Sequence, residues 1–384
     1  MAFFVAVLAV WIAVHVYVVW RVASIPAVAA RVPRKGLIAG AALLGSSYIA
    51  ARFAEHFGAG LAGRLLEFAG ASWMGVLFLV FASLLLADVV TGFGYLLPRA
   101  AGGVRAWALA VAGILSVVAF VQGMRPPVVR EQEVRLAGLP EALDGTVVAL
   151  TSDLHLGTLL GERWLTARIA QIDSLTPDLV VLCGDILEGD GPREMNLLPV
   201  LRRLRAPMGV FAVTGNHEFY AGLEKSARFL ADAGVRVLRD AAVEVRPGFV
   251  LAGVDDLTAR RQLARDGDPV RRALEGRPAG ATIFLSHTPW QAEKAAAAGA
   301  GLMVSGHTHA GQIWPFDLLV RLSYPLLQGR YDVGGMPVIV CRGTGTWGPR
   351  MRLWRPGEIV RVTLRAASPA AGTRTAGDAP AHAG

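Results

Sequence analysis

The segment TVVALTSDLHLG, residues 146–157, joins a short apolar run to an acid and a histidine, and it decides the fold that we expect. Continuous runs of Val, Ala and Leu of this length are typical of strands buried on both faces of a sheet. Similar runs recur along the chain, ending beside Gly, Asp, Asn or His. They predict strands at residues 146–152, 179–183, 210–214, 250–254, 282–286 and 302–305.

Segments with helical periodicity lie between these strands. They predict helices at residues 163–172, 197–204, 223–233 and 291–298. Buried strands that alternate with helices favour a layered α/β sandwich. We expect this domain to occupy residues 126–365, and we expect residues 366–384, which are rich in Ala, Pro, Gly and Thr, to form a disordered tail.

The composition of the whole chain indicates a second half that lies in a membrane. Of 384 residues, 53% are hydrophobic and 18% charged, and the mean hydropathy of +0.45 is too high for an ordinary soluble domain. These proportions, and a count of two cysteines, exclude intrinsic disorder, collagen and a disulfide scaffold. The apolar excess predicts a bundle of four transmembrane helices within residues 1–125, each close to the ~20 residues that cross a hydrocarbon core. Their expected bounds are about 3–20, 36–52, 72–97 and 106–124.

The net charge of +8 belongs mostly to this membrane half. Residues 1–125 hold 9 Lys and Arg against 3 Asp and Glu, a net charge of +6, which leaves +2 for the remainder. The remainder has no basic stripe with interleaved aromatic residues, so no nucleic-acid partner is expected. The positive-inside rule favours a multi-pass inner-membrane protein whose termini and α/β domain lie outside the cytoplasm. The counts of basic residues on the two sides of the membrane differ by one residue, and a lost or extra span reverses the expected orientation.

Two ionisable residues, His15 and Asp88, fall inside the predicted spans. Such groups are costly in lipid and are often functional. A hydrogen bond within the bundle for His15, and a position near a helix end for Asp88, are simpler interpretations than a proton or ion pathway.

Metal-capable side chains follow the predicted strands, at the rim where ligands bind in open α/β sheets. They are Asp153, His155, Asp185, Asn216, His217, His287, His307 and His309. Nitrogen and oxygen ligands without a thiolate suit divalent Mn, Fe, Zn or Ni. About seven ligands are too many for one tetrahedral ion, so we expect two divalent ions that share a carboxylate. Such a pair activates a water as hydroxide for attack at phosphorus.

Taken in order, the motifs SDLH, GD, GNH, SH and GHTH resemble those of the calcineurin-like metallophosphoesterases over residues 145–365. The resemblance implies that Asp185 bridges two metal ions and that His217 is the general acid for the departing oxygen. It also implies the remaining ligands, which are Asp153, His155 and His309 for one ion and Asn216, His287 and His307 for the other. The position after His217 is most often Asp in that family and is Glu218 here, so the acid is kept.

A further likeness concerns the segment CRGTGTWGPRMRLW, residues 341–354. Residues 342–345 resemble the Arg-Gly stretch of the membrane-associated branch of the family, which includes enzymes that cleave a UDP-linked diacylglucosamine. Arg342 and Arg350, with Arg352 beside them, are candidate substrate-binding residues, because a guanidinium matches phosphate bidentately. Surface or core-rim arginines are the equally plain alternative.

These observations predict a membrane-anchored dinuclear-metal phosphohydrolase that cleaves phosphoester or pyrophosphate bonds. The expected partners are the bilayer and a phosphate-containing substrate, with a lipid-linked substrate as one option, and no obligate protein partner is expected. The alternative is a membrane sensor or transporter whose metal-binding domain is not catalytic. A nuclease would require binding that weakens steeply with salt, which a near-neutral domain does not favour.

Overall fold

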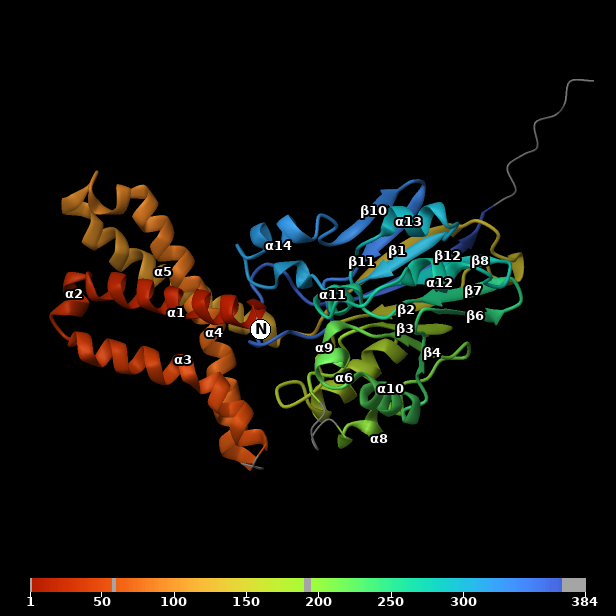
Figure 1. Cartoon of the computed structure of the whole chain (residues 1–384), viewed down its shortest axis with the longest axis horizontal. Helices are drawn as coiled ribbons and strands as arrows, with labels where there is room; N and C mark the ends of the chain where they lie inside the picture. Colours follow the sequence, from red (N-terminus) through yellow and green to blue (C-terminus); the bar gives the residue numbers. More distant parts are fainter. Residues whose placement is uncertain (1, 57–59, 190–194, 368–384) are drawn as a thin grey trace, which may run out of the picture.

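The computed structural model describes residues 2–56, 60–189 and 195–367 (Figure 1). Long helices form its N-terminal part, and an α/β body follows them. Most of the tail expected to be disordered, residues 368–384, lies outside the described residues.

The N-terminal part consists of helices that run back and forth between the α/β body and a far end (Figure 1). Two short helices, α2 and η1, connect the long ones at the far end. Their bounds are α1 (Ala2–Ala23), α2 (Pro26–Ala29), α3 (Arg34–His56), α4 (Gly60–Val90), η1 (Gly92–Gly94) and α5 (Pro98–Met124).

Among the described residues, three helices are long and apolar enough to cross a membrane: α1, α4 and α5. The expectation of four spans is therefore confirmed for three. Helix α3 falls short because Arg34, Lys35 and several Gly and Ser residues dilute its apolar stretch. The third expected span, 72–97, starts within α4, but its last residues lie beyond the helix, because α4 stops at Val90 before the glycine turn at Gly92.

Polar groups within the bundle have partners there. Asp88 is buried and pairs with Arg21 and Arg105, and it accepts a hydrogen bond of 2.7 Å from the hydroxyl of Tyr17. His15 Nε2 accepts a hydrogen bond of 2.9 Å from the indole of Trp73 and so also bonds within the bundle. These contacts agree with the structural interpretation of both ionisable residues.

The α/β body contains two six-stranded sheets. The first sheet has the order β1 (Val128–Leu136), β12 (Glu358–Ala366), β2 (Val147–Thr151), β3 (Leu179–Cys183), β4 (Val210–Val213) and β5 (Arg236–Val237). In this sheet β2 to β5 run parallel, and β12 pairs antiparallel with β2 and parallel with β1.

The second sheet has the order β10 (Gly329–Val333), β11 (Met336–Val340), β9 (Leu302–Ser305), β8 (Ala281–Leu285), β7 (Phe249–Gly253) and β6 (Ala241–Arg246). Here β7, β8, β9 and β11 run parallel, and the edge strands β6 and β10 are antiparallel to their neighbours.

The main core lies between the two sheets, and helices cover their outer faces (Figure 1). Residues such as Val181 of β3 and Ile283 of β8 meet in this core. Among the described residues, the helices of the body are α6 (Glu162–Asp173), α8 (Leu198–Leu201), α9 (Asn216–Tyr220), α10 (Leu223–Asp232), α11 (Leu257–Gln262), α12 (Pro269–Leu274), α13 (Ala292–Ala297) and α14 (Asp317–Ser323), with the short 3₁₀ helices η2 (Glu141–Leu143) and η3 (His309–Gly311). The expected α/β sandwich is thus present, and the helix expected at 197–204 is shorter than predicted.

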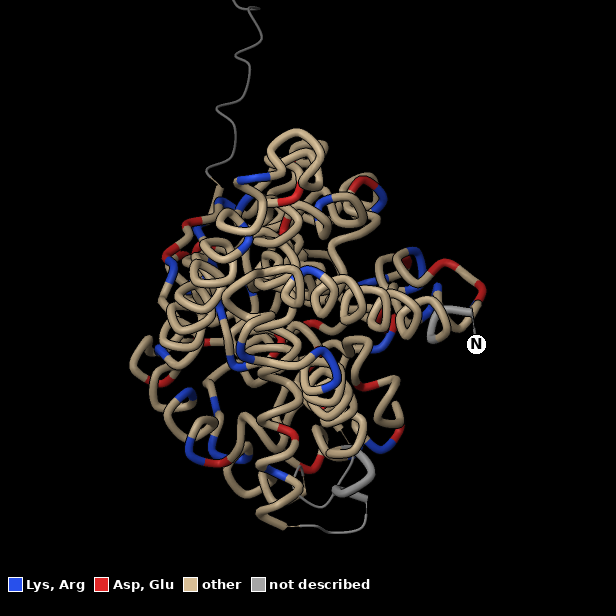
Figure 2. Tube along the Cα trace, turned by 90° about the vertical axis from the view of Figure 1, so that its left-hand side faces the viewer, with Lys and Arg blue, Asp and Glu red and all other residues tan. Residues whose placement is uncertain are grey.

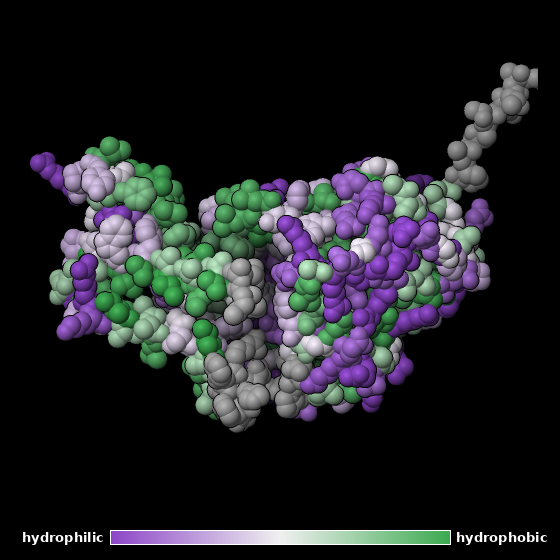
Figure 3. Space-filling model, viewed as in Figure 1, coloured by the Kyte–Doolittle hydropathy of each residue, from purple (hydrophilic) through white to green (hydrophobic). Residues whose placement is uncertain are grey.

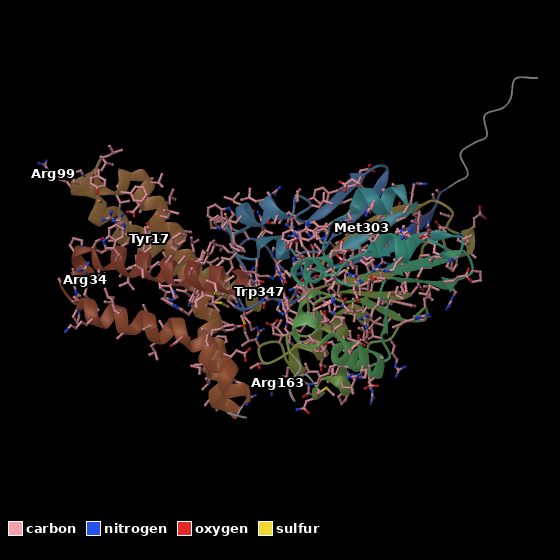
Figure 4. All side chains as sticks on the ribbon, viewed as in Figure 1. Tyr17, Arg34, Arg99, Arg163, Met303 and Trp347 are labelled. Carbon is pink, nitrogen blue, oxygen red and sulfur yellow. The ribbon has the colours of Figure 1, made fainter. Side chains whose placement is uncertain are left out.

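The body packs against the middle of α4 and the C-terminal end of α5. Leu79 of α4 and Ala119 of α5 form one apolar cluster with Ile313, Met351 and Leu353. A backbone hydrogen bond also crosses this junction, from the amide of Arg352 to the carbonyl of Ala119 at 2.9 Å. Trp347 lies at this junction, and Arg34 and Arg99 lie at the opposite end of the bundle (Figure 4).

Charged positions are dispersed over the described chain. In the view of Figure 2, Lys and Arg positions and Asp and Glu positions are both scattered over the trace.

Candidate metal centre

The loops after β2, β3, β4, β8 and β9 converge at the end of the body that faces the membrane helices (Figure 1). Together they carry all eight of the metal-capable residues predicted from the sequence. Five of these residues have a positive φ, between 45° and 70°: Asp153, His155, Asp185, His307 and His309. Side chains other than Gly rarely adopt this conformation, and strained residues of this kind cluster at functional sites.

Three groups of side chains offer ligand atoms that lie within 4.8 Å of one another. They are Asp153, His155 and His309; His155, Asp185 and His217; and Asp185, His287 and His307. Asp185 belongs to two of these groups, and it stands between the residues expected for one ion and those expected for the other. The geometry is therefore compatible with two neighbouring ions, and the role of each ligand stays a prediction.

The first group closes tightly around one point. His309 Nε2 lies 3.1 Å from His155 Nε2 and 3.2 Å from Asp153 Oδ1. The other oxygen, Asp153 Oδ2, accepts hydrogen bonds from Ser152 Oγ at 2.5 Å and from the amide of His307 at 3.1 Å. Asp153 is thus fixed through one oxygen, and the second oxygen faces the two imidazoles.

The group of Asp185, His287 and His307 is equally close. His287 Nε2 lies 3.1 Å from His307 Nδ1 and 3.2 Å from Asp185 Oδ2. Asn216 lies at the start of α9, after β4, and is buried. Among the described residues, Asn216 Oδ1 and Asp153 Oδ1 are buried oxygens without a hydrogen-bond partner. Such atoms are costly unless a cation or a water occupies the space before them.

Hydrogen bonds on the outer side of two rings fix which nitrogen faces inward. His287 Nδ1 donates to the carbonyl of Cys183 at 2.7 Å, and His155 Nδ1 donates to Glu188 at 2.7 Å. When these rings are neutral, their inward Nε2 atoms carry the lone pairs. Metal-ligating histidines are usually oriented in this way, by a carbonyl or a carboxylate on the other ring nitrogen.

The pKa values of the candidate ligands are shifted, because charged groups lie close together where they are buried from solvent. Burial raises the pKa of Asp153 and of Asp185, but nearby imidazoles, above all His309 for Asp153 and His287 for Asp185, outweigh burial and hold both pKa values below their usual range. Burial lowers the pKa of His287, yet the carboxylates of Asp185 and Asp153 bring it well above its usual value. Burial and His287 lower the pKa of His307 to about 3. Divalent ions would replace the proton on His287 and neutralise the buried carboxylates.

Glu218 fixes the Asp185 loop through hydrogen bonds to its backbone. Its carboxylate is buried and accepts four backbone hydrogen bonds, from Asp185 at 3.0 Å, Ile186 at 2.8 Å, Leu187 at 3.0 Å and Gly215 at 2.7 Å. Burial, together with the charge of Asp185, raises the pKa of Glu218 to about 7, against the effect of these donors. The acid next to His217 therefore positions the loop and does not face the ions.

Two glycines allow the loops to approach this closely. A Cβ atom on Gly215 would collide with Asp185, and one on Gly306 would collide with Ser152 and with Asp153 Oδ2. Both positions therefore need glycine for the space that it leaves, and the site would open if either gained a side chain.

His217 lies at the edge of the cluster with its ring in contact with neighbours. Its amide donates to Asp185 Oδ1 at 2.9 Å, and its Nδ1 lies 3.4 Å from Glu188 Oε2. Glu188 was not predicted from the sequence, although it follows Asp185 by three residues in GDILEGD. It contacts both His155 and His217, and the acidic side chain so close to a candidate ligand was the signal that could have revealed it.

The three candidate arginines occupy different environments. Arg342 is bound to Glu358, with 2.9 Å between Nε and Oε2. Arg352 is buried and donates to the backbone carbonyls of residues 342, 343, 345 and 355, so its guanidinium braces this loop. Arg350 is half-buried, its Nε has no hydrogen-bond partner, and burial lowers its pKa. A substrate role for Arg342 and Arg350 is not tested by these contacts.

Comparisons with known proteins bear on the same region. Residues 146–311 match the family model for the calcineurin-like phosphoesterase. The chain is 34% identical over 272 residues to a zebrafish (Danio rerio) protein named transmembrane protein with metallophosphoesterase domain, covering 68% of this chain and 62% of that protein. An uncharacterized metallophosphoesterase of Helicobacter pylori (strain J99) is 33% identical, covering 64% of this chain and 66% of its own length.

A shorter relative matches the chain over most of its own length and identifies the family. An uncharacterized metallophosphoesterase of Aquifex aeolicus is 36% identical over 219 residues, which are 56% of this chain and 83% of that protein. The chain spans less than two thirds of the length of the zebrafish relative, so that protein's whole activity does not transfer directly. With the converging strand ends and this match, the chain belongs to the calcineurin-like metallophosphoesterase family.

Proposed function

We propose that this protein is a membrane-anchored, dinuclear-metal phosphohydrolase that cleaves phosphoester or pyrophosphate bonds. The observation that carries the proposal is the placement of Asp185 between two sets of inward-facing ligand atoms. Asp153 Oδ1 and Asn216 Oδ1 are buried there without a hydrogen-bond partner among the described residues. The family typically binds two divalent metals, and phosphoesters are the substrates that fit it.

In this proposal Asp153, His155 and His309 hold one ion, and Asn216, His287 and His307 hold the other. Asp185 contributes to both sites. Mn, Fe, Zn and Ni all suit these nitrogen and oxygen ligands. When bound, two such ions acidify a shared water and neutralise charge on the phosphate oxygens.

His217 would move the proton to the leaving oxygen. The Glu188 carboxylate beside Nδ1 orients the ring, which leaves Nε2 as the atom that carries a proton towards a substrate. Glu188 also fixes His155, so one carboxylate orients a ligand and the acid together. A displaced Glu188 would therefore weaken both metal binding and proton transfer.

A lipid-linked substrate is the option that the surroundings of the site favour. A small pocket beside His155 and Glu188 is walled on its other side by Tyr48 of α3 and Glu67 of α4. A substrate that reaches the site through this pocket would pass the membrane helices. Arg350, whose backbone carbonyl adjoins Gly123 of α5, and Arg342 are the arginines that we propose to meet the substrate phosphate.

For the membrane half, we propose a division at residue 125, with the catalytic domain at 126–365 and a tail at 366–384. Helix α3 would cross as a fourth span, because it packs closely on α4, where Gly70 touches the backbone of Tyr48. Arg34 and Arg99 lie at the far end of the bundle (Figure 4), and under the positive-inside rule this supports a cytoplasmic far end and a domain outside the cytoplasm.

Activity of the full chain tests this proposal. The purified protein is loaded with Mn²⁺ in nanodiscs and assayed with bis-p-nitrophenyl phosphate, beside Asp185→Asn and His217→Ala. Asp185→Asn is expected to lose metal and activity together. His217→Ala is expected to keep its metal and lose turnover, least for substrates with good leaving groups, because these need no acid.

Two results would contradict it. Activity that survives both substitutions would exclude the mechanism. Two bound ions without turnover on phosphodiesters, phosphomonoesters or pyrophosphates would instead support the alternative, a membrane sensor or transporter with a non-catalytic metal-binding domain.

A further inference from the structure

Helix α14 exposes an unusual set of large apolar side chains. Leu318, Leu319 and Leu322 are 60%, 57% and 81% exposed. The residue on its inner side is charged, because Asp317 is buried and accepts a hydrogen bond of 2.7 Å from Arg355. The helix therefore turns its leucines outward and its acid inward, which is the reverse of a helix that covers a core.

The exposed surface extends beyond the helix. We define the lip as residues 314–323, which include Trp314 and Phe316, exposed by 38% and 39%. Trp354, which is 50% exposed, packs against Trp314 with 5.1 Å between ring centroids. An apolar patch of this kind on a domain marks an interaction surface.

The lip is continuous with the membrane helices. The ring of Phe316 packs on Phe78 of α4 with 5.4 Å between centroids, and the amide of Trp354 donates to Gln122 of α5 at 2.7 Å. Hydrophobic surface covers the position of α14 on the side of the bundle (Figure 3). Both contacted helices are long and apolar enough to cross a membrane.

We propose that the lip lies in the bilayer that α4 and α5 cross, with its leucines at the boundary between headgroups and acyl chains. Short amphipathic helices bind this layer through Leu and Phe, and Trp is enriched there. Lipid, not a second protein, is the occupant, because the patch adjoins the point where the spans meet the body.

This placement has a consequence for the candidate metal centre. The lip follows the loop that carries His307 and His309. Directly after the lip comes Tyr324, whose hydroxyl lies 2.8 Å from His307 Nε2. A lip held in the bilayer would therefore hold two candidate ligands at the level of the headgroups. This consequence rests on the proposed function, and the membrane contact itself does not.

Depth in the bilayer tests the contact directly. Leu322→Cys is labelled with an NBD fluorophore in the full chain, in phosphatidylcholine nanodiscs; both native cysteines, Cys183 and Cys341, are buried. Ala297→Cys is the control, because Ala297 is exposed on α13, farther from the bundle (Figure 1). The label at 322 is expected to be quenched by nitroxide-labelled lipids and protected from iodide, with the opposite result at 297.

Two outcomes would overturn the proposal. Quenching at 322 by iodide to the same extent as at 297 would put the lip in water. Protection at 322 from both quenchers would mean that protein covers it.

A second variant separates this inference from the proposed function. Leu319→Glu combined with Leu322→Glu is expected to lower hydrolysis of a p-nitrophenyl ester of phosphatidic acid in nanodiscs by at least tenfold, with hydrolysis of bis-p-nitrophenyl phosphate unchanged. Equal loss on both substrates would overturn the headgroup placement. A wild type that cleaves neither substrate would refute the proposed function, and the quenching result would still decide the position of the lip.

Discussion

Replacing Glu218 with Gln should weaken the fold and the candidate metal centre together. The Glu218 carboxylate accepts two backbone N–H groups on each oxygen, at 2.7–3.0 Å. An amide nitrogen has no lone pair to offer, so either orientation of Gln leaves two buried donors without an acceptor. Each orphaned donor costs about 1–3 kcal/mol, which gives about 2–6 kcal/mol in total. A protonated carboxyl keeps lone pairs on both oxygens, so the loss is expected on either side of the raised pKa of about 7.

The assay is thermal unfolding of the full chain in nanodiscs, with Mn²⁺ affinity measured in parallel. For a domain of this size, a loss of that magnitude lowers Tm by on the order of 10 °C. A loosened Asp185 loop should also cost roughly 10–100-fold in metal affinity, as is typical when groups behind a ligand are removed. Glu224→Gln is the matched control, because Glu224 is an exposed acid in an ion pair with Arg239, and exposed pairs contribute little.

The reasoning fails if Glu218→Gln unfolds and binds Mn²⁺ like the wild type. It also fails if Glu218→Gln and Glu224→Gln lose the same stability, because the backbone bonds would then carry no special weight.

Three further predictions concern other parts of the molecule. Gly306→Ala should lose most bound metal, since the new methyl group would displace Asp153, and a full complement of metal in this variant would argue against the close approach. Metal affinity should rise with pH, because Asp185 outweighs burial and raises the pKa of His287 in the metal-free protein, so that a metal ion must displace a proton there. Calorimetry in buffers of different ionisation enthalpy should show proton release on metal binding near pH 7. A metal affinity that is constant between pH 6 and 8 would contradict this prediction. Asp88→Ala should destabilise the bundle by leaving two arginines unpaired, measured as a lower yield of folded protein from detergent, whereas an unchanged yield would mean that the ion pairs contribute nothing.

The strands of the sheet centre could be predicted from the sequence because they are buried on both faces. The strands expected at 179–183 and 302–305 have those bounds in the structure, and the others shift by a residue or two. Strands β1 and β12 were missed, because charged residues interrupt their apolar runs. The buried apolar run of β11 was missed as well, and so were the short or partly exposed strands β5, β6 and β10. Apolar runs therefore identify most of the central strands, and the remaining strands need the structure.

The candidate site shows a similar division. Residues with metal-binding chemistry could be selected because they follow strands, and the structure brings all of them to one rim. Glu188 and Glu218 could not be assigned, because a carboxylate that orients a ring or holds a loop is distinguished only by its hydrogen bonds. The lip was missed for another reason, since the sequence does not distinguish a leucine that faces lipid from one that faces a core.

The central claim is that two ions lie on either side of Asp185. Anomalous diffraction from crystals of the Mn²⁺-loaded full chain, recorded at the manganese edge, tests it most directly. The account predicts two peaks about 3.5–4 Å apart, one beside Asp153 and His309 and the other beside His287 and His307. A single peak, two distant peaks, or none at this rim in metal-replete crystals would contradict it.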